Sequence, residues 1–223
     1  MSTFVKFAIL NDLRTMKMKK LFFLAAAIAM LLSSCKDAET SFVRVEDGRF
    51  VSNDHPSYFA GTNFWYGAIL GSEGQGGDRE RLARELDFLK ENGMVNLRVL
   101  VGGDGPDGVP TRVSPTLQKS PGVYNDTIFR GLDYFLAELA KRDMKAVLYL
   151  NNSWEWSGGY GMYLEWAGEG KSLIPAEVGY GPYMESVSKF VSSEKAKALF
   201  ADHVRHVVTR TNTVTGKPYK ARS

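Results

Sequence analysis

The chain has 223 residues, of which 44% are hydrophobic, 12% aromatic and 24% charged, a composition typical of folded globular proteins rather than disordered or fibrous ones. The formal net charge is +3, but five of the 28 Lys and Arg and only one of the 25 acidic residues precede Cys35. The rest of the chain is close to neutral, so we expect no nucleic-acid partner. One cysteine and three histidines exclude a disulfide framework and a Cys/His zinc site, and we expect no metal or other cofactor.

The first 34 residues have the features of a lipoprotein signal peptide. Three lysines precede an apolar run over residues 21–32, which is too short to span a bilayer. Leu32-Ser33-Ser34-Cys35 resembles the bacterial lipobox, so we expect lipid on Cys35, attachment to an outer membrane or cell surface, and a linker over residues 35–41. The alternative is a plain secretory signal, which would leave the protein secreted. Residues 1–15 fit no part of a signal and indicate an over-extended start.

The mature chain, which we expect to form one domain over residues 42–223, begins with a predicted β-hairpin. Residues 42–45 and 49–51 are rich in β-formers, and Asp47-Gly48 between them suits the positive φ values of a type I′ turn. A short apolar strand is predicted next, over residues 58–64.

Helices and strands then alternate. Leucines at positions 82, 86 and 89 recur at helical spacing and predict a helix over residues 78–92. Further apolar patterns predict a strand over 95–101, a helix over 126–142, a strand over 145–150 and a helix from residue 193. The resulting βαβαβα order implies an α/β fold with a parallel sheet and right-handed crossovers.

Two long connections follow predicted strands. Residues 102–124 contain five Gly and four of the eight Pro, and residues 152–191 contain three of the four Trp. Because the loops after parallel strands build the site in such folds, we expect the functional residues there. The Gly-rich residues 71–77 do not indicate a nucleotide site, since they lack the Lys-Ser/Thr of a P-loop and lead into Asp78.

Aromatic rings and amides at two predicted strand ends are typical of a sugar-binding surface. Rings stack on the C–H faces of sugars, while amides bind hydroxyl groups. The candidates are Asn63 and Trp65 after the first strand, and Asn151, Asn152, Trp154 and Trp156 after the third. The alternative for the last two tryptophans is packing in the core.

Charged residues give further candidates. Arg98 is the one charged residue in the predicted strand 95–101. If its side chain points into a barrel, it needs a carboxylate partner to offset the cost of burying its charge. The alternative is an outward-facing, solvated side chain. Glu155 and Glu165 are the acids beside the aromatic residues and by themselves suggest a catalytic pair. His203 and His206 are expected to be surface residues rather than metal ligands.

Six segments resemble the endo-β-1,4-mannanases of glycoside hydrolase family 5. They are FAGTNFWYG (59–67), NLRVLV (96–101), PGVYN (121–125), GLDYFLAELAKR (131–142), KAVLYLNNSWEWSGGY (145–160) and VVTRTNTVTGKPY (207–219). The resemblance implies the N-terminal part, about three βα units, of a TIM (β/α)8 barrel, preceded by the hairpin. It also implies retaining hydrolysis of internal bonds in β-mannan.

The resemblance assigns roles to several residues. Arg98 would orient the nucleophile, Trp154 with Asn151 and Asn152 would line the glycone side of the cleft, and Trp65 would contribute from the first strand. Glu155 and Glu165 become ordinary loop residues.

The resemblance implies that the two catalytic glutamates would fall beyond Ser223, because in the family the acid/base ends the fourth strand, shortly after a stretch like residues 215–219, and the nucleophile ends the seventh. We therefore expect a truncated, inactive mannanase in which Arg98 is the supporting residue present. The alternatives are a related β-1,4-glycanase or a noncatalytic surface lipoprotein that binds β-mannan through Trp65, Trp154 and Trp156.

Overall fold

The computed structural model describes residues 43–220, which divide into one unit ending at Tyr58 and a second beginning at Phe59. The described part of the first unit is an antiparallel sheet of β1 (Arg44–Glu46), β2 (Arg49–Ser52) and β3 (His55–Pro56). Asp47 and Gly48 have φ values of 49° and 73°, so the predicted hairpin and its turn are confirmed. Cys35 and the boundaries expected at residues 34 and 41 lie outside the described residues.

The second unit is built on a three-stranded parallel sheet in the order β4-β5-β8. Its strands are β4 (Ala60–Asn63), β5 (Met94–Leu100) and β8 (Lys145–Tyr149), which confirms the predicted parallel arrangement. β4 is shorter than predicted because Tyr58 and Phe59 do not join the sheet and are 78% and 55% exposed.

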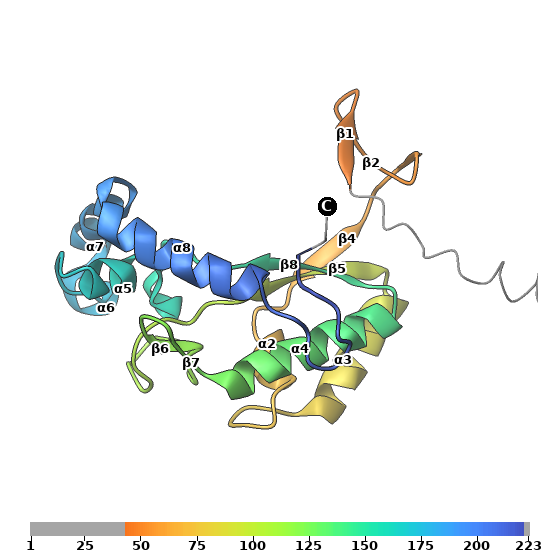
Figure 1. Ribbon diagram of the computed structural model, residues 1–223, viewed down its shortest axis with the longest axis horizontal. Helices are drawn as coiled ribbons and strands as arrows, with labels where there is room; N and C mark the ends of the chain where they lie inside the picture. Colours follow the sequence, from red (N-terminus) through yellow and green to blue (C-terminus); the bar gives the residue numbers. More distant parts are fainter. Residues whose placement is uncertain (1–42, 221–223) are drawn as a thin grey trace, which may run out of the picture. The chain divides into compact units, whose positions relative to one another are not determined.

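Three helices lie on one side of this sheet (Figure 1). They are α2 (Gly67–Leu70), α3 (Arg79–Glu91) and α4 (Asp126–Lys141). The Asp78 side chain caps α3 by accepting the Arg81 N–H at 2.8 Å, and Asn125 caps α4 by accepting the Thr127 N–H at 3.2 Å. The main core lies between these helices and the sheet, and includes Leu82, Leu86, Leu97, Val99, Leu132, Phe135 and Leu139.

The two faces of the sheet differ. Leu97 and Val99 of β5 are fully buried beneath the helices. Between them, Arg98 points to the other face, as does its register partner Val147, which is 51% exposed. In the described part of the chain, this second face has no covering helix (Figure 1). A sheet of this kind is an arc of a barrel, with one face toward an outer ring of helices and the other toward the barrel interior.

The two long connections contain short elements of their own. The first holds a hairpin of β6 (Gln118–Ser120) and β7 (Val123–Tyr124). The second holds η1 (Glu155–Ser157), α5 (Gly159–Trp166), α6 (Pro175–Val178), α7 (Tyr180–Ser188) and η2 (Lys189–Ser192), and leads into α8 (Glu194–Val208). A smaller core joins this region through Tyr163, Leu164, Phe190 and Ala196.

None of the helices found between residues 43 and 220 has the length and apolar character needed to cross a membrane.

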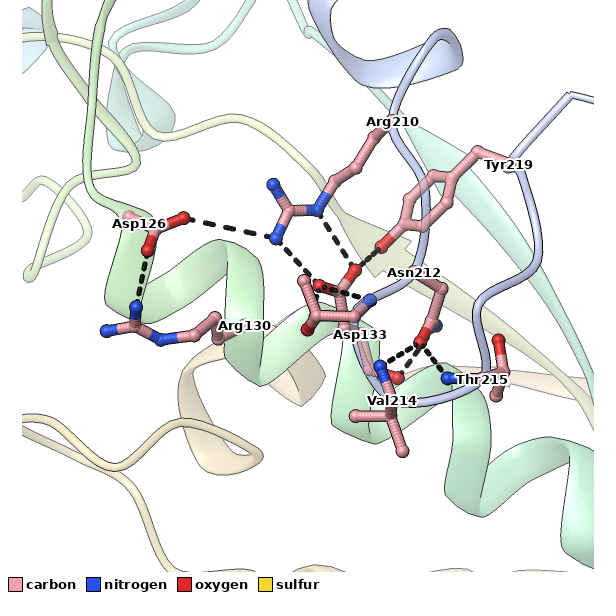
Figure 2. Close-up of polar contacts among 9 residues, drawn as sticks. Asp126, Arg130, Asp133, Arg210, Asn212, Val214, Thr215 and Tyr219 are labelled. Atoms are coloured by element: carbon pink, nitrogen blue, oxygen red, sulfur yellow. Dashed lines mark hydrogen bonds and ion pairs between the residues drawn. The ribbon is translucent and has the colours of Figure 1, made fainter.

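A buried carboxylate attaches the loop after α8 to α4 (Figure 2). Asp133 is 0% exposed, and its two oxygens accept hydrogen bonds from Arg210 Nε at 3.0 Å and Nη2 at 2.7 Å. The hydroxyls of Thr213 and Tyr219 donate to the same carboxylate at 2.7 and 2.6 Å. Burial alone would raise the pKa of Asp133, but these hydrogen bonds hold it below its usual value. The carboxylate therefore stays charged at neutral pH.

Asn212 reinforces the same attachment. Its Nδ2 donates to the Asp133 backbone carbonyl at 2.9 Å, and its Oδ1 accepts the N–H groups of Val214 and Thr215, both at 2.9 Å (Figure 2). The loop is thus fixed both by charge and by its own turn.

His203 of α8 does not lie on the surface, so the expectation for this residue was wrong. It is 0% exposed, and its Nε2 lies 2.9 Å from the carbonyl oxygen of Val101, the residue after β5. Burial lowers its pKa, and the hydrogen bond to Val101 opposes this only in part. His203 therefore stays neutral and ties α8 to the carboxyl end of the sheet, whereas His206 is exposed as expected.

We expect Asp133→Ala to lower the free energy of unfolding by about 3–5 kcal/mol, because it leaves the largely buried Arg210 with only the 4.0 Å contact to Asp126 and removes the acceptor of the Thr213 and Tyr219 hydroxyls. The control is Asp202→Ala, which removes an exposed ion pair with Arg205 and should cost less than about 1 kcal/mol. Urea unfolding at pH 7 measures both. Since the pKa of Asp133 is lowered, the difference between the variants should shrink as the pH falls below about 4. Equal losses at pH 7 would contradict this account.

We expect the free energy of unfolding to fall as the pH drops below about 6.5, because the unfolded chain then binds a proton that folded His203 excludes. His203→Gln keeps an amide donor for Val101 and removes the titrating group, so it should make the fall shallower. Urea titrations between pH 7.5 and 5.5 compare the slopes of the native chain and the variant; identical slopes would show that His203 is not responsible.

Candidate functional site

Two tryptophans bring the ends of β4 and β8 together. Trp65 follows β4, Trp156 lies in η1 after β8, and their ring centroids are 5.5 Å apart at an interplanar angle of 73°. The backbone carbonyl of Trp65 also accepts the N–H of Leu100 at 3.2 Å, which holds it against β5. The two strand ends at which the sequence placed the site are therefore neighbours.

Polar side chains lie on the helix-free face of the sheet beside these rings. Asn63, exposed at the end of β4, is the register partner of Arg98 on β5. The Arg98 guanidinium lies 3.5 Å from the centroid of the Tyr149 ring on β8, a cation–π contact. Among residues 43–220, no carboxylate forms an ion pair with Arg98. Arg98 thus offers a positive charge to this face, held in place by an aromatic ring.

The two asparagines after β8 have different environments. The Asn152 side chain accepts the Trp154 N–H at 2.6 Å and donates to the Ser157 hydroxyl at 2.7 Å. Asn151 Oδ1 accepts the Asn152 N–H at 2.7 Å, while its buried Nδ2 has no partner in the described part of the chain. Asn152 therefore shapes the loop, and Asn151 retains a free donor.

The two tryptophans of this loop also differ. Trp154 is 47% exposed, and its ring contacts Tyr180 at the start of α7, with centroids 5.9 Å apart. Trp156 is partly buried against Trp65. Of the two rings, Trp154 therefore offers more exposed surface to a ligand. Trp156 is in part a packing residue, as the alternative interpretation expected.

Two adjacent glycines fix the path of this loop. Gly158 has a φ of +77°, and a Cβ there would lie 2.0 Å from the carbonyl oxygen of Asp104. Gly159 has a φ of +50°, and a Cβ there would lie 2.3 Å from the carbonyl oxygen of Asn152. Side chains at either position would therefore clash with backbone.

The acidic side chains near these aromatic residues lie in turns, short helices or the protein interior. The Glu165 carboxylate accepts the Ser172 N–H at 2.7 Å and closes the turn after α5, while Glu155 begins η1. Asp104, which the sequence did not single out, is 2% exposed and accepts a hydrogen bond from the Tyr163 hydroxyl at 3.3 Å. Burial raises the pKa of Asp104 well above its usual range. No group of three or more His, Cys, Asp or Glu within the described ranges could hold a metal ion.

The sequence and structure match known glycoside hydrolases. A family model described as GH family 5 beta-mannosidase-like covers residues 40–222. The putative mannan endo-1,4-beta-mannosidase 9 of Oryza sativa subsp. japonica is 32% identical over 200 residues, which cover 88% of this chain and 44% of that protein. The mannan endo-1,4-beta-mannosidase 5 of Solanum lycopersicum is 28% identical over 204 residues, covering 90% and 45%.

Solved structures agree. A glycoside hydrolase family 5 mannosidase from Rhizomucor miehei is 37% identical with a TM-score of 0.77, covering 83% of this chain and 47% of that one. An endo-1,4-beta-mannanase from Rhizomucor miehei, 24% identical with a TM-score of 0.61, shares the fold over 80% of this chain and 44% of its own. The chain thus spans less than half the length of these relatives. It belongs to glycoside hydrolase family 5, and its described part folds as the N-terminal portion of a (β/α)8 barrel.

Proposed function

We propose that this chain provides the sugar-binding face of an endo-acting β-1,4-mannan hydrolase that retains anomeric configuration. The observation that carries the proposal is the meeting of Trp65 and Trp156, which follow β4 and β8 at the carboxyl end of a parallel sheet whose middle strand β5 carries Arg98. In barrel enzymes this end holds the active site. The curated relatives are named as mannan endo-1,4-beta-mannosidases, which supports a hydrolase over the noncatalytic binding protein.

The chemistry requires groups that residues 43–220 do not supply at this face. Retaining hydrolysis uses one carboxylic acid to protonate the leaving oxygen and a carboxylate about 5–5.5 Å away to attack the anomeric carbon. Glu165 is engaged in a turn, and Glu155 lies in η1. We infer that both catalytic carboxylates come from other segments of the barrel. The positive charge of Arg98 would keep such a nucleophile ionised and oriented.

We expect the chain alone to release no reducing ends from mannan. A chimera that joins residues 43–220 to the C-terminal half of the Rhizomucor miehei family 5 mannosidase should release them. In that chimera, Arg98→Ala should lower kcat by on the order of a hundredfold, because the nucleophile loses its positioning partner.

The controls are Glu155→Gln and Glu165→Gln, which should leave turnover within about twofold. Turnover by the chain alone that either glutamine substitution abolishes would mean that the local acids perform the reaction.

We further propose that the protein is a bacterial envelope lipoprotein anchored through Cys35. The support is the sequence Leu32-Ser33-Ser34-Cys35 after a signal-length apolar run. Two acyl signals on one residue would hold the protein stably at a membrane.

In a bacterial host, Cys35→Ala should move the full-length product from the membrane fraction to the soluble fraction. Ser34→Ala, which keeps a small residue before the cysteine, serves as the control and should leave the product in the membrane fraction. Immunoblots of both fractions measure this, and an unchanged distribution of Cys35→Ala would contradict lipid anchoring.

A further inference from the structure

Two exposed aromatic residues form a corner in the long connection after β8. The corner consists of Trp154, which precedes η1, and Tyr180, the first residue of α7. Their rings meet nearly at right angles, with an interplanar angle of 79°. The two residues remain 47% and 59% exposed although they touch each other. This corner therefore presents two ring surfaces to solvent at a defined angle.

The corner is held from both sides. Tyr183, one helical turn after Tyr180, is 0% exposed, and its hydroxyl donates to the backbone carbonyl of Ser153. The N–H of Trp154, the next residue, donates to the Asn152 side chain. Because the Tyr183 side chain ties α7 to this loop and the Trp154 backbone is hydrogen-bonded within it, binding a ligand here would order few additional groups.

Internal packing does not account for Tyr180. The nearby small core is formed by buried rings, including Tyr163 and Phe190, and Tyr180 is not part of it. The Tyr180 hydroxyl makes no hydrogen bond within the described residues. A ring with exposed faces and a free hydroxyl suits a sugar, which needs an apolar stacking surface and a polar partner together.

We propose that Trp154 and Tyr180 form an additional subsite for one more sugar unit of a β-1,4-linked mannan chain. The inference rests on the proposed function and deepens it. Trp154 and Trp156 lie at the two ends of one short turn, so a chain bound at the Trp65–Trp156 strand ends can extend onto the corner. Such a subsite adds affinity for longer oligosaccharides and none for the shortest.

The test uses the full chain and calorimetric titration with mannohexaose and mannobiose. Tyr180→Ala should weaken mannohexaose binding by roughly two- to tenfold, the range expected for one stacking contact, and leave mannobiose binding unchanged. Tyr180→Phe should retain most of the affinity. The control is Tyr58→Ala, which removes a tyrosine that is 78% exposed in the first unit. Near-UV circular dichroism verifies that each variant is folded.

The outcomes separate this inference from the proposed function. Unchanged mannohexaose binding in Tyr180→Ala, with weaker binding in Trp154→Ala, would overturn the subsite and leave the mannan site standing. An equal loss for both mannosides would also overturn it. Binding of cellohexaose in place of mannohexaose, still weakened by Tyr180→Ala, would support the subsite and overturn mannan as the substrate. Binding of neither hexaose by the native chain would overturn both.

Discussion

The buried charge of Asp133 is the constraint on which the rest of the second unit depends. Its carboxylate binds Arg210, Thr213 and Tyr219, and so fastens the loop after α8 to α4. α4 in turn packs closely against α2, where a Cβ on Gly131 would lie 2.2 Å from a backbone oxygen of Ala68. A buried ion pair contributes less net stability than its contact energy suggests, but removing either partner leaves a charge uncompensated in the interior.

The two faces of the sheet lie in different environments. The helix side is apolar and closely packed, with Leu97 and Val99 fully buried. The other side carries Asn63 and Arg98, the latter stacked on Tyr149. Alternation along one strand therefore separates the residues that stabilise the fold from those available for chemistry. His203 contributes to both the packing and the candidate site, because it is buried and its ring contacts the carbonyl of Val101 at the end of β5.

The elements with a strong local pattern could be predicted from the sequence. The helix over 126–142 and the strand over 145–150 agree with α4 and β8 to within one residue at each end, because their apolar periodicity and the Asn125 cap are local signals. α2, α6 and β7 are too short for any period to develop, and they depend on tertiary contacts. β4 is shorter than predicted because apolar character alone did not reveal which residues pair.

For the candidate site, the sequence indicated which residue types gather but not how they are arranged. The sequence indicated aromatic residues at two strand ends, but not that Trp65 and Trp156 touch while Trp154 turns outward to Tyr180. Contacts between residues more than 20 positions apart leave no local signal. His203 was misplaced because it was weighed only as a metal ligand or a surface residue, although it lies with Ala196 and Val207 among the buried residues of α8.

The glycine pair at 158–159 has a consequence for how the loop can evolve. Neither position has room for a Cβ, so almost any substitution of Gly158 or Gly159 would disrupt the loop, whether it arises naturally or in a mutant library. Trp154, four positions before Gly158, is exposed, so its side chain is not confined by close contact with backbone. Substitutions are therefore tolerated more readily at the exposed side chain of Trp154 than at the two glycines that set the backbone path of the loop.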